Sequence, residues 1–216
     1  MDVDLGTLTP KHCYNLMVST IVPRPIALVT TLDAEGRTNA APFSFFNAMG
    51  QDPPLLAFAV EARGPGAVKD TLDNVRARKE FTIGLVDEAM AEKMNVCAID
   101  FPPGVDELAE AKLTAAPSRQ IAVPRIAECP IAWECRLHTI VETGPDRGVV
   151  LGRAVHFHAR DGLIDQTKFY VDTPALRLIG RMHGRSWYAR TSDRFEMPRI
   201  AVADWPARKA ERDRGR

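Results

Sequence analysis

Short hydrophobic runs separated by turns dominate the first third of the chain. Residues 26–32 are rich in β-formers, and the turn at 33–36 places a glycine where positive φ is needed before residues 37–41. This pattern predicts a β-hairpin. Two prolines, Pro53 and Pro54, then break the chain before an apolar run at 55–60. That run predicts a third strand.

The next pattern alternates between helical and strand periods. Apolar residues recur at helical spacing between 69 and 79, where Asp70 and Asp73 are expected to cap the first turn. Residues 80–86 alternate as a strand does, and Asp87 is expected to N-cap a following short helix. Helices inserted between strands, without strict βαβ alternation, argue against a doubly wound parallel sheet.

The second half of the chain contains the longest β patterns. They span 131–141 and 149–158, and in the first of them Glu134 shares the polar face with its neighbours at alternate positions. Residues 101–124 are interpreted as surface structure without chemistry, and a tight turn is predicted at 160–162. With about six or seven strands, the fold class is mainly β with short helices (α+β), as a closed antiparallel barrel.

Length and charge set the limits of this picture. With 216 residues, 45% of them hydrophobic, the chain can bury one core. We expect one domain over residues 1–200 and a charged C-terminal tail over 201–216 that frays. Lys plus Arg equals Asp plus Glu at 28 each, so no global field attracts nucleic acid or an anionic membrane.

The ends and the cysteines add two expectations about the cellular compartment. The acidic N-terminus does not resemble a secretory signal, and no apolar run approaches the roughly 20 residues of a membrane span, so a soluble cytoplasmic protein is expected. Cys13, Cys97, Cys129 and Cys135 are scattered and form no CxxC pair. We expect buried free thiols.

Three ordered segments carry a resemblance to a known family. Residues 23–31, 36–46 and 52–54 resemble the flavin reductase-like, FMN-binding split β-barrel family, which includes flavoredoxin-like proteins. The resemblance continues through 69–71, 80–86 and 181–188 and covers nearly the whole chain except the charged tail. It implies a Greek-key-like antiparallel barrel, a homodimer, and FMN rather than FAD as the cofactor.

The resemblance also implies which residues contact the flavin. The candidates in the first hairpin and the loop after it are Thr30, Thr31, Asn39, Ala41, Pro42, Ser44 and Phe45. Those at the start of the first helix are Lys69, Asp70 and Thr71. The candidates near the cofactor or the dimer seam are Arg24, Arg181 and Tyr188. At Gly84 the chain departs from the family, in which asparagine is common, so a side chain near the dimer or the flavin is missing.

Physical chemistry supports these candidates independently. Hydroxyl and amide groups, a lysine and the free N–H groups of a helix start can bind ribityl and phosphate oxygens. Neither GxGxxG nor GxxxxGK[ST] occurs, so no Rossmann or P-loop site is predicted. Each residue also has a plainer interpretation: Thr30 and Thr31 as β-formers, Ser44 as a turn hydroxyl, and Lys69 to Thr71 as an ordinary helix start.

Histidines and aromatic residues leave alternatives open. His156 and His158 have a spacing that can bind a transition metal, but no nearby Cys, Asp or Glu completes a ligand set, so no metal is expected. His183, among Arg181, Arg185 and Tyr188, either meets substrate and protonates reduced flavin or is a surface cation. The aromatic pair Trp187 and Tyr188 either stacks on a ring system or anchors the dimer.

Three functions follow from these observations. The first is an oxidoreductase in which NAD(P)H reduces the flavin, and the flavin passes electrons to a small acceptor or a partner oxygenase. This chemistry belongs to the cofactor and demands no catalytic side chain. The second is an FMN-binding electron carrier reduced by a protein partner. The third is a structural barrel with an altered or empty pocket.

Overall fold

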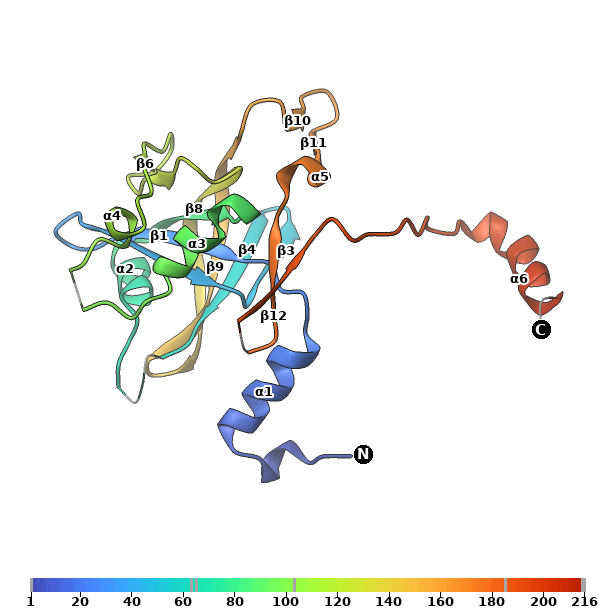
Figure 1. Ribbon diagram of the computed structural model, residues 1–216, viewed down its shortest axis with the longest axis horizontal. Helices are drawn as coiled ribbons and strands as arrows, with labels where there is room; N and C mark the ends of the chain where they lie inside the picture. Colours follow the sequence, from blue (N-terminus) through green and yellow to red (C-terminus); the bar gives the residue numbers. More distant parts are fainter. Residues whose placement is uncertain (1, 63, 65, 103, 185, 215–216) are drawn as a thin grey trace.

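A seven-stranded antiparallel sheet forms the centre of the computed structural model, which describes residues 2–62, 64, 66–102, 104–184 and 186–214 (Figure 1). The strand order is β2-β1-β5-β8-β9-β4-β3. The strands of this sheet are β1 (Ala27–Leu32), β2 (Thr38–Phe43), β3 (Phe46–Gln51), β4 (Pro54–Val60), β5 (Glu80–Leu85), β8 (Ile131–Gly144) and β9 (Arg147–Ala159). Three short hairpins are β6 (Ala115–Ala116) with β7 (Arg125–Ile126), β10 (Ile164–Asp165) with β11 (Tyr170–Val171), and β12 (Ile179–Met182) with β13 (Trp187–Arg190).

Short helices surround this sheet. They are α1 (Pro10–Thr20), α2 (Asp70–Arg78), α3 (Ala91–Val96), α4 (Glu107–Glu110), α5 (Thr173–Leu176) and α6 (Trp205–Arg214), with single 3-10 turns at Leu5–Thr7, Glu88–Met90 and Val202–Asp204. The hairpin, the third apolar run, α2 and β5 are confirmed at nearly the predicted residues. Helix α1 and strand β3 were not predicted.

The two edge strands of the sheet are neighbours in the chain. Only Ser44 and Phe45 separate β2 from β3. Because all neighbouring strands of the seven-stranded sheet are antiparallel, its first and last strands, β2 and β3, run in the same direction. The two strands are therefore one bent strand that leaves one edge and enters the other. The step from Phe43 to Phe46 spans at most about 11 Å, so the sheet must curl. No ladder joins β2 to β3 in the described residues, so full closure of the barrel stays a prediction.

The core has two parts because β1 is buried on both faces. On one face Val29 packs with Phe58 and Phe81, and α2 contributes to the same cluster. On the other face Leu28 packs with a cluster that includes Met90 and Met94 around α3. Burial on both faces explains why β1 reads as an unbroken run of β-formers. The β1–β2 hairpin is thereby fixed between two packed layers.

Local caps agree only in part with the sequence. Asp87 accepts a hydrogen bond from the backbone of Met90, as predicted. The N-cap of α2 is Lys69 rather than Asp70, and it makes no side-chain capping bond. Residues 205–214 form helix α6, which Figure 1 shows at the end of an extended segment far from the sheet, where fraying was expected.

Packing explains the glycine at position 84. Gly84 lies in β5 opposite Leu28 and Ala132, and a Cβ added there would clash with the sulfur of Cys129. Gly84 does not line the cleft described below. Core packing against Cys129 therefore leaves no room for an asparagine side chain at this position.

The thiols and the helices give two further outcomes. Cys97, Cys129 and Cys135 are buried and free as expected, whereas Cys13 is only half-buried because α1 lies on the surface. Burial raises the pKa of Cys97 and of Cys129 to about 12. Within the described part of the chain, we find no helix with both the length and the apolar character that crossing a membrane requires.

Candidate functional site

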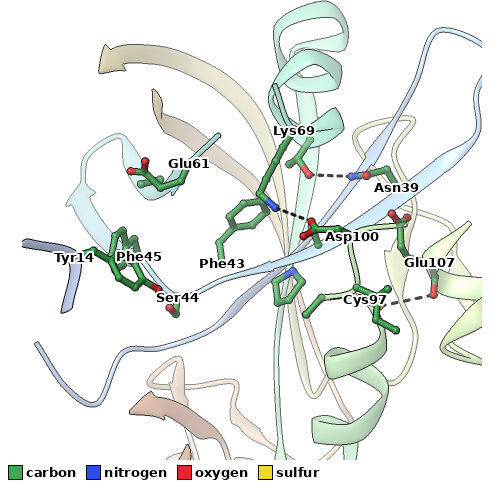
Figure 2. A pocket seen from close by; sticks show the side chains of 16 residues that line it. Tyr14, Asn39, Phe43, Ser44, Phe45, Glu61, Lys69, Cys97, Asp100 and Glu107 are labelled. Atoms are coloured by element: carbon green, nitrogen blue, oxygen red, sulfur yellow. Dashed lines mark hydrogen bonds and ion pairs between the residues drawn. The ribbon is translucent and has the colours of Figure 1, made fainter. Parts of the chain in front are cut away.

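A cleft of about 230 Å³ opens where the bent strand β2–β3 meets the start of α2 and the segment after α3 (Figure 2). Its lining includes seven predicted residues: Asn39, Ala41, Pro42, Ser44, Phe45, Lys69 and Thr71. The remaining lining residues, which the sequence did not indicate, are Tyr14, Phe43, Ala59, Glu61, Cys97, Ala98, Ile99, Asp100 and Glu107.

Asn39 is the centre of a buried polar network at the cleft. Its side-chain amide donates to the hydroxyls of Thr31 and Thr71, both at 3.0 Å, and Asn74 also donates to Thr31 at 3.0 Å. Because Thr71 accepts from Asn39, its own hydroxyl hydrogen is free to point into the cleft. The network therefore leaves the Thr71 hydroxyl as a hydrogen-bond donor at the lining of the cleft.

The start of α2 lies beside this donor. Lys69, the N-cap residue, makes no side-chain capping bond, and its backbone carbonyl accepts the N–H groups of Leu72 and Asp73. Lys69 Nζ lies 3.6 Å from Asp100 Oδ1. A positive side chain and a helix N-terminus are the groups that bind an anion. Here the lysine is already paired within the chain.

Aromatic and apolar residues form the opposite wall of the cleft. Phe45 contacts Tyr14 of α1, with ring centroids 6.4 Å apart, and Figure 2 shows both rings across the cleft from Asp100. Ala40 donates its N–H to Glu107 rather than to β1, at 3.0 Å. Pro42 is two residues further along this edge, so its lack of an N–H costs no ladder bond. The two rings are tilted by 44° to each other, and with Pro42 they make this wall mainly apolar.

Arg24 fixes the position of this wall from behind. The guanidinium donates to Ser44 Oγ at 3.3 Å and to the carbonyls of Val18 and Ile21 at the end of α1, at 2.7 and 2.9 Å. It also lies over the Phe45 ring, 5.8 Å from the centroid. Burial lowers its pKa. Arg24 thus holds α1 against the bent strand and does not itself line the cleft.

Three carboxyl groups lie along the cleft, those of Glu61, Asp100 and Glu107. Glu107 is 6% exposed. Burial raises its pKa; the hydrogen bond from Ala40 opposes that shift, and the charges of Asp70 and Asp106 add to it. Cys97 donates to the backbone carbonyl of Glu107 at 3.8 Å. Residues 101–124 were interpreted as surface structure without chemistry, but Glu107 of α4 is buried and lines the cleft.

Several predicted contacts lie outside the cleft of one chain. Thr30 and Thr31 are fully buried behind it, since β1 is covered on both faces; Thr31 supports Asn39, and the Thr30 hydroxyl has no partner among the described residues. Asp70 faces a neighbouring depression with Asp33 and Asn74. Thr31 acts on the cleft through Asn39, and the charge of Asp70 acts on Glu107.

The C-terminal candidates lie on a separate hairpin. Arg181 pairs with Tyr188 across β12 and β13, with its guanidinium 4.7 Å from the ring centroid. His183 follows β12, and its ring faces a groove next to α1 rather than the cleft. Nδ1 of His183 is buried without a partner among the described residues. Arg185 lies outside the described residues.

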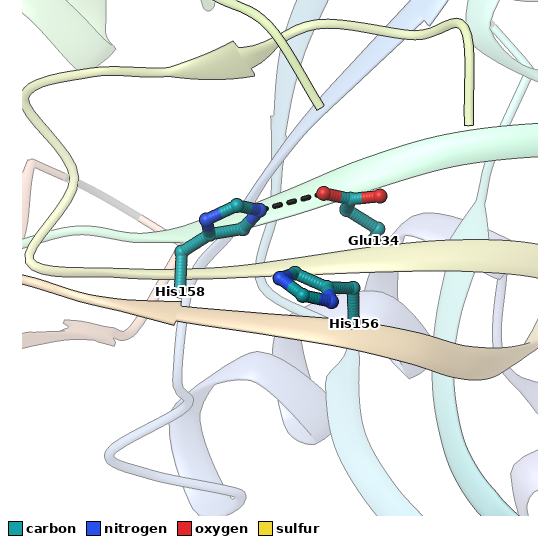
Figure 3. Close-up of side chains that lie close together, drawn as sticks. All are labelled: Glu134, His156 and His158. Atoms are coloured by element: carbon teal, nitrogen blue, oxygen red, sulfur yellow. Dashed lines mark hydrogen bonds and ion pairs between the residues drawn. The ribbon is translucent and has the colours of Figure 1, made fainter. Parts of the chain in front are cut away.

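The histidine pair has a carboxylate beside it, contrary to expectation. Glu134 of β8 lies directly across from His156 of β9 and accepts from or donates to His158 Nε2 at 2.6 Å (Figure 3). Although burial opposes it, hydrogen bonds from Arg119, His158 and Gln120 lower the pKa of Glu134. The premise that no Asp or Glu completes a ligand set is corrected.

Comparisons with known proteins agree with this geometry. Residues 18–176 match the family model described as the flavin reductase like domain. A protein of Deinococcus radiodurans is 42% identical over 98% of this chain and 95% of its own length. The structure of Pseudomonas fluorescens 2-nitrobenzoate 2-nitroreductase NbaA is 39% identical, covers 94% of this chain and 98% of its own, and has a TM-score of 0.86.

A second solved structure is nearly as similar. Nitrilotriacetate monooxygenase component B from Bacillus cereus is 33% identical over 91% of this chain and 98% of its own, also with a TM-score of 0.86. The family match covers well over half of the chain and every lining residue of the cleft except Tyr14. By its sequence and its fold, the chain belongs to the flavin reductase-like family.

Proposed function

We propose that this chain binds FMN in the cleft at Asn39 and Thr71, accepts a hydride from NAD(P)H, and passes electrons to a small acceptor or a partner oxygenase. The observation that carries the proposal is the Thr71 donor, fixed by Asn39 beside the uncapped start of α2. The two similar structures support the reaction class, because one is a nitroreductase and the other a monooxygenase component.

The chemistry of the lining fits a flavin. Thr71 and Lys69 would hold the phosphate, because they place a hydroxyl and an ammonium at the positive end of the α2 helix dipole. Pro42 and Phe45 would cover one face of the ring as a flat apolar surface. When bound, the flavin supplies the hydride and electron chemistry. The role of the chain is to orient the ring, exclude water and leave one side open to the donor.

A second copy of the chain is part of this proposal. A cavity of about 230 Å³ lies below the roughly 300–1,000 Å³ of most small-molecule sites, so one chain supplies only part of a flavin site. An apolar groove of about 560 Å³ runs from Phe46 and Leu56 to Leu178 and Ile179. We infer that the partner copy covers this groove and completes the cleft.

The C-terminal segment is the matching surface for that groove. Phe195, Met197 and Val202 are 82%, 80% and 91% exposed, and Figure 1 shows the segment extended away from its own sheet. Apolar side chains exposed in a row mark an interaction surface. A homodimer that exchanges these segments would bury them, and its two-fold symmetry would stop the assembly at two copies. A cytoplasmic location, where NADH and NADPH are available, remains a prediction.

The test is anaerobic reduction of the FMN-loaded protein. We expect NADH or NADPH to bleach the flavin absorbance, and an added electron acceptor to restore it over repeated turnovers. If FMN binds but neither nicotinamide reduces it while a protein donor does, the electron-carrier alternative replaces the enzyme. If no flavin binds in a titration, the structural-barrel alternative replaces both.

A further inference from the structure

A second constellation of ligand-type side chains lies on β8 and β9. Glu134, His156 and His158 come from adjacent strands, and none of them lines the cleft. Glu134 pairs with His156 in the strand register, and His158 lies two residues further along the same face. Figure 3 shows the His158 ring pointing to the carboxylate of Glu134, with the His156 ring beside them. The flavin chemistry uses none of these groups.

We propose that Glu134, His156 and His158 form a binding site for a divalent first-row transition metal ion such as Zn²⁺. Two imidazoles and one carboxylate are the ligand types of such ions, and three protein ligands leave a fourth position for water. A divalent ion against a single carboxylate would leave the site with one net positive charge.

The distances between the ligand atoms are close to those of a tetrahedral metal site. One ligand atom from each residue can be chosen so that all three lie within 4.8 Å of one another. Ligands bound to a tetrahedral Zn²⁺ at about 2.1 Å are about 3.4 Å apart. The 2.6 Å contact between His158 Nε2 and Glu134 Oε1 would open slightly, while the wider pair would close. Side-chain rotations on two fixed strands are enough for both changes.

The carboxylate is oriented before any ion arrives. Glu134 has no exposed surface, and its two oxygens accept the backbone N–H groups of Arg119 and Gln120, both at 2.7 Å. Hydrogen bonds of this kind around a ligand fix its direction toward a metal. Both histidines are partly exposed, so solvent reaches the site. The site therefore combines a rigid buried ligand with two reachable ones.

The alternative is a purely structural pair of Glu134 and His158. Such a pair would hold the segment at 119–120 to the sheet and would need no third member. His156 separates the two interpretations, because no hydrogen bond to its ring is found among the described residues; its recorded ring contact is with His158, at 4.7 Å between centroids. Replacing His156 removes a metal ligand and leaves the pair and its backbone bonds in place.

The experiment is a Co²⁺ titration of untagged, chelator-treated protein, followed by visible absorbance, with Zn²⁺ competition. We expect one Co²⁺ per chain, displaced by Zn²⁺, and at least tenfold weaker binding in His156→Ala. His138→Ala is the matched control, because His138 is an exposed histidine of β8 away from the cluster. It is expected to bind Co²⁺ as the wild type does.

A thermal measurement supplies a second readout that does not depend on colour. Saturating Zn²⁺ is expected to raise the Tm of the wild type and of His138→Ala, and to raise that of His156→Ala much less. Without metal, all three proteins are expected to unfold at the same temperature. Absence of Co²⁺ binding by the wild type, or equal binding by His156→Ala, would overturn the metal site and leave the structural pair.

Discussion

Two regions of the molecule differ in whether their polar and aromatic side chains are buried. One is the wall of the cleft between Asn39 and Thr71, and the other is the C-terminal region from Arg181 onward. In the cleft wall, Asn39 and Thr71 are 8% and 1% exposed and bonded to each other. In the C-terminal region, Trp187 is 64% exposed and Phe195 is 82% exposed. The resemblance places Arg181 and Tyr188 of the second region, like the cleft residues, near the flavin or the dimer seam. The polar groups of the cleft wall have partners within one chain, whereas the aromatic side chains of the second region are left exposed.

This difference separates what one chain preorganises from what association must supply. Buried polar groups need their partners in the folded monomer, because an unpaired one costs about 1–3 kcal/mol. Exposed aromatic and apolar side chains are tolerated in the folded monomer, and burying them against a partner favours association. We therefore expect changes in the two regions to affect different measurements.

The largest effect is expected from the C-terminal segment. The double variant Phe195→Asp, Met197→Asp places two charges where the partner copy would bury apolar side chains. The dissociation constant of the dimer is expected to rise at least about 100-fold, measured by sedimentation equilibrium or light scattering over a concentration series. The folded monomer itself is expected to keep its stability, because neither residue packs on the core.

Arg208→Asp is the control for that variant, because Arg208 is an exposed residue of α6. It changes charge in the same segment without removing an apolar contact, so the dimer is expected to persist. Equal weakening by both variants would indicate a general charge effect. A dimer unaffected by the double variant would remove the C-terminal segment from the proposed seam.

An intermediate effect is expected inside the cleft. Thr71→Val keeps the shape of the side chain but removes the hydroxyl that Asn39 orients toward the ligand. The Kd for FMN is expected to rise about tenfold, as loss of a hydrogen bond to a charged group would produce. Fluorescence quenching of FMN measures this change.

Thr82→Val is the matched control in β5. Thr82 is also buried, and its hydroxyl donates one hydrogen bond, to the carbonyl of Pro124 at 3.1 Å. This variant is expected to lower stability by an amount similar to Thr71→Val and to leave the Kd for FMN unchanged. If both variants weakened FMN binding equally, the Thr71 hydroxyl would be a packing group and not a ligand.

The smallest effect is expected from the buried carboxyl of Glu107. Because burial raises its pKa in the folded protein, ionisation opposes folding: stability is lost as pH rises from the ordinary glutamate value through the folded pKa. Glu107→Gln keeps an oxygen for the N–H of Ala40. Its Tm is expected to exceed that of the wild type by a few degrees at pH 7, because the neutral amide avoids the cost of burying a charge.

The pH dependence is what identifies this effect. The gain of Glu107→Gln is expected to vanish below about pH 4, where the wild-type carboxyl is protonated in both states. Glu110→Gln, at an exposed position of the same helix, is expected to show no such pH-dependent gain. Calorimetry at several pH values compares the three proteins. A gain that is the same at all pH values would contradict a charge-based cause.

Local patterns predicted the parts of the fold that local forces determine. The β1–β2 hairpin follows from β-formers around a glycine turn, and α2 follows from its 3.6-residue period. Strand β3 was missed because Phe46 to Gln51 is mostly exposed and has no alternation of apolar and polar residues. Its place at the sheet edge depends on pairing with β4, which is a tertiary contact.

The residues of the site that belong to recognisable sequence segments were predictable. Those that burial or the register of strand pairing brings together were not. Asn39, Ser44 and Thr71 follow from ordered segments. Glu107 was missed because an acidic residue that will be buried has the same sequence appearance as one on the surface. Glu134 was not matched to the histidines because the pairing of β8 with β9 shifts at a bulge next to Glu134, which no count of residues reveals.

The central claim is that this cleft holds FMN, and an equilibrium titration of the purified apoprotein with FMN tests it most directly. With flavin fluorescence and light scattering recorded on the same samples, the account predicts one FMN per chain and two per dimer. It also predicts about tenfold weaker binding in Thr71→Val and unchanged binding in Thr82→Val. Absence of saturable FMN binding, or binding that Thr71→Val does not weaken, would contradict it.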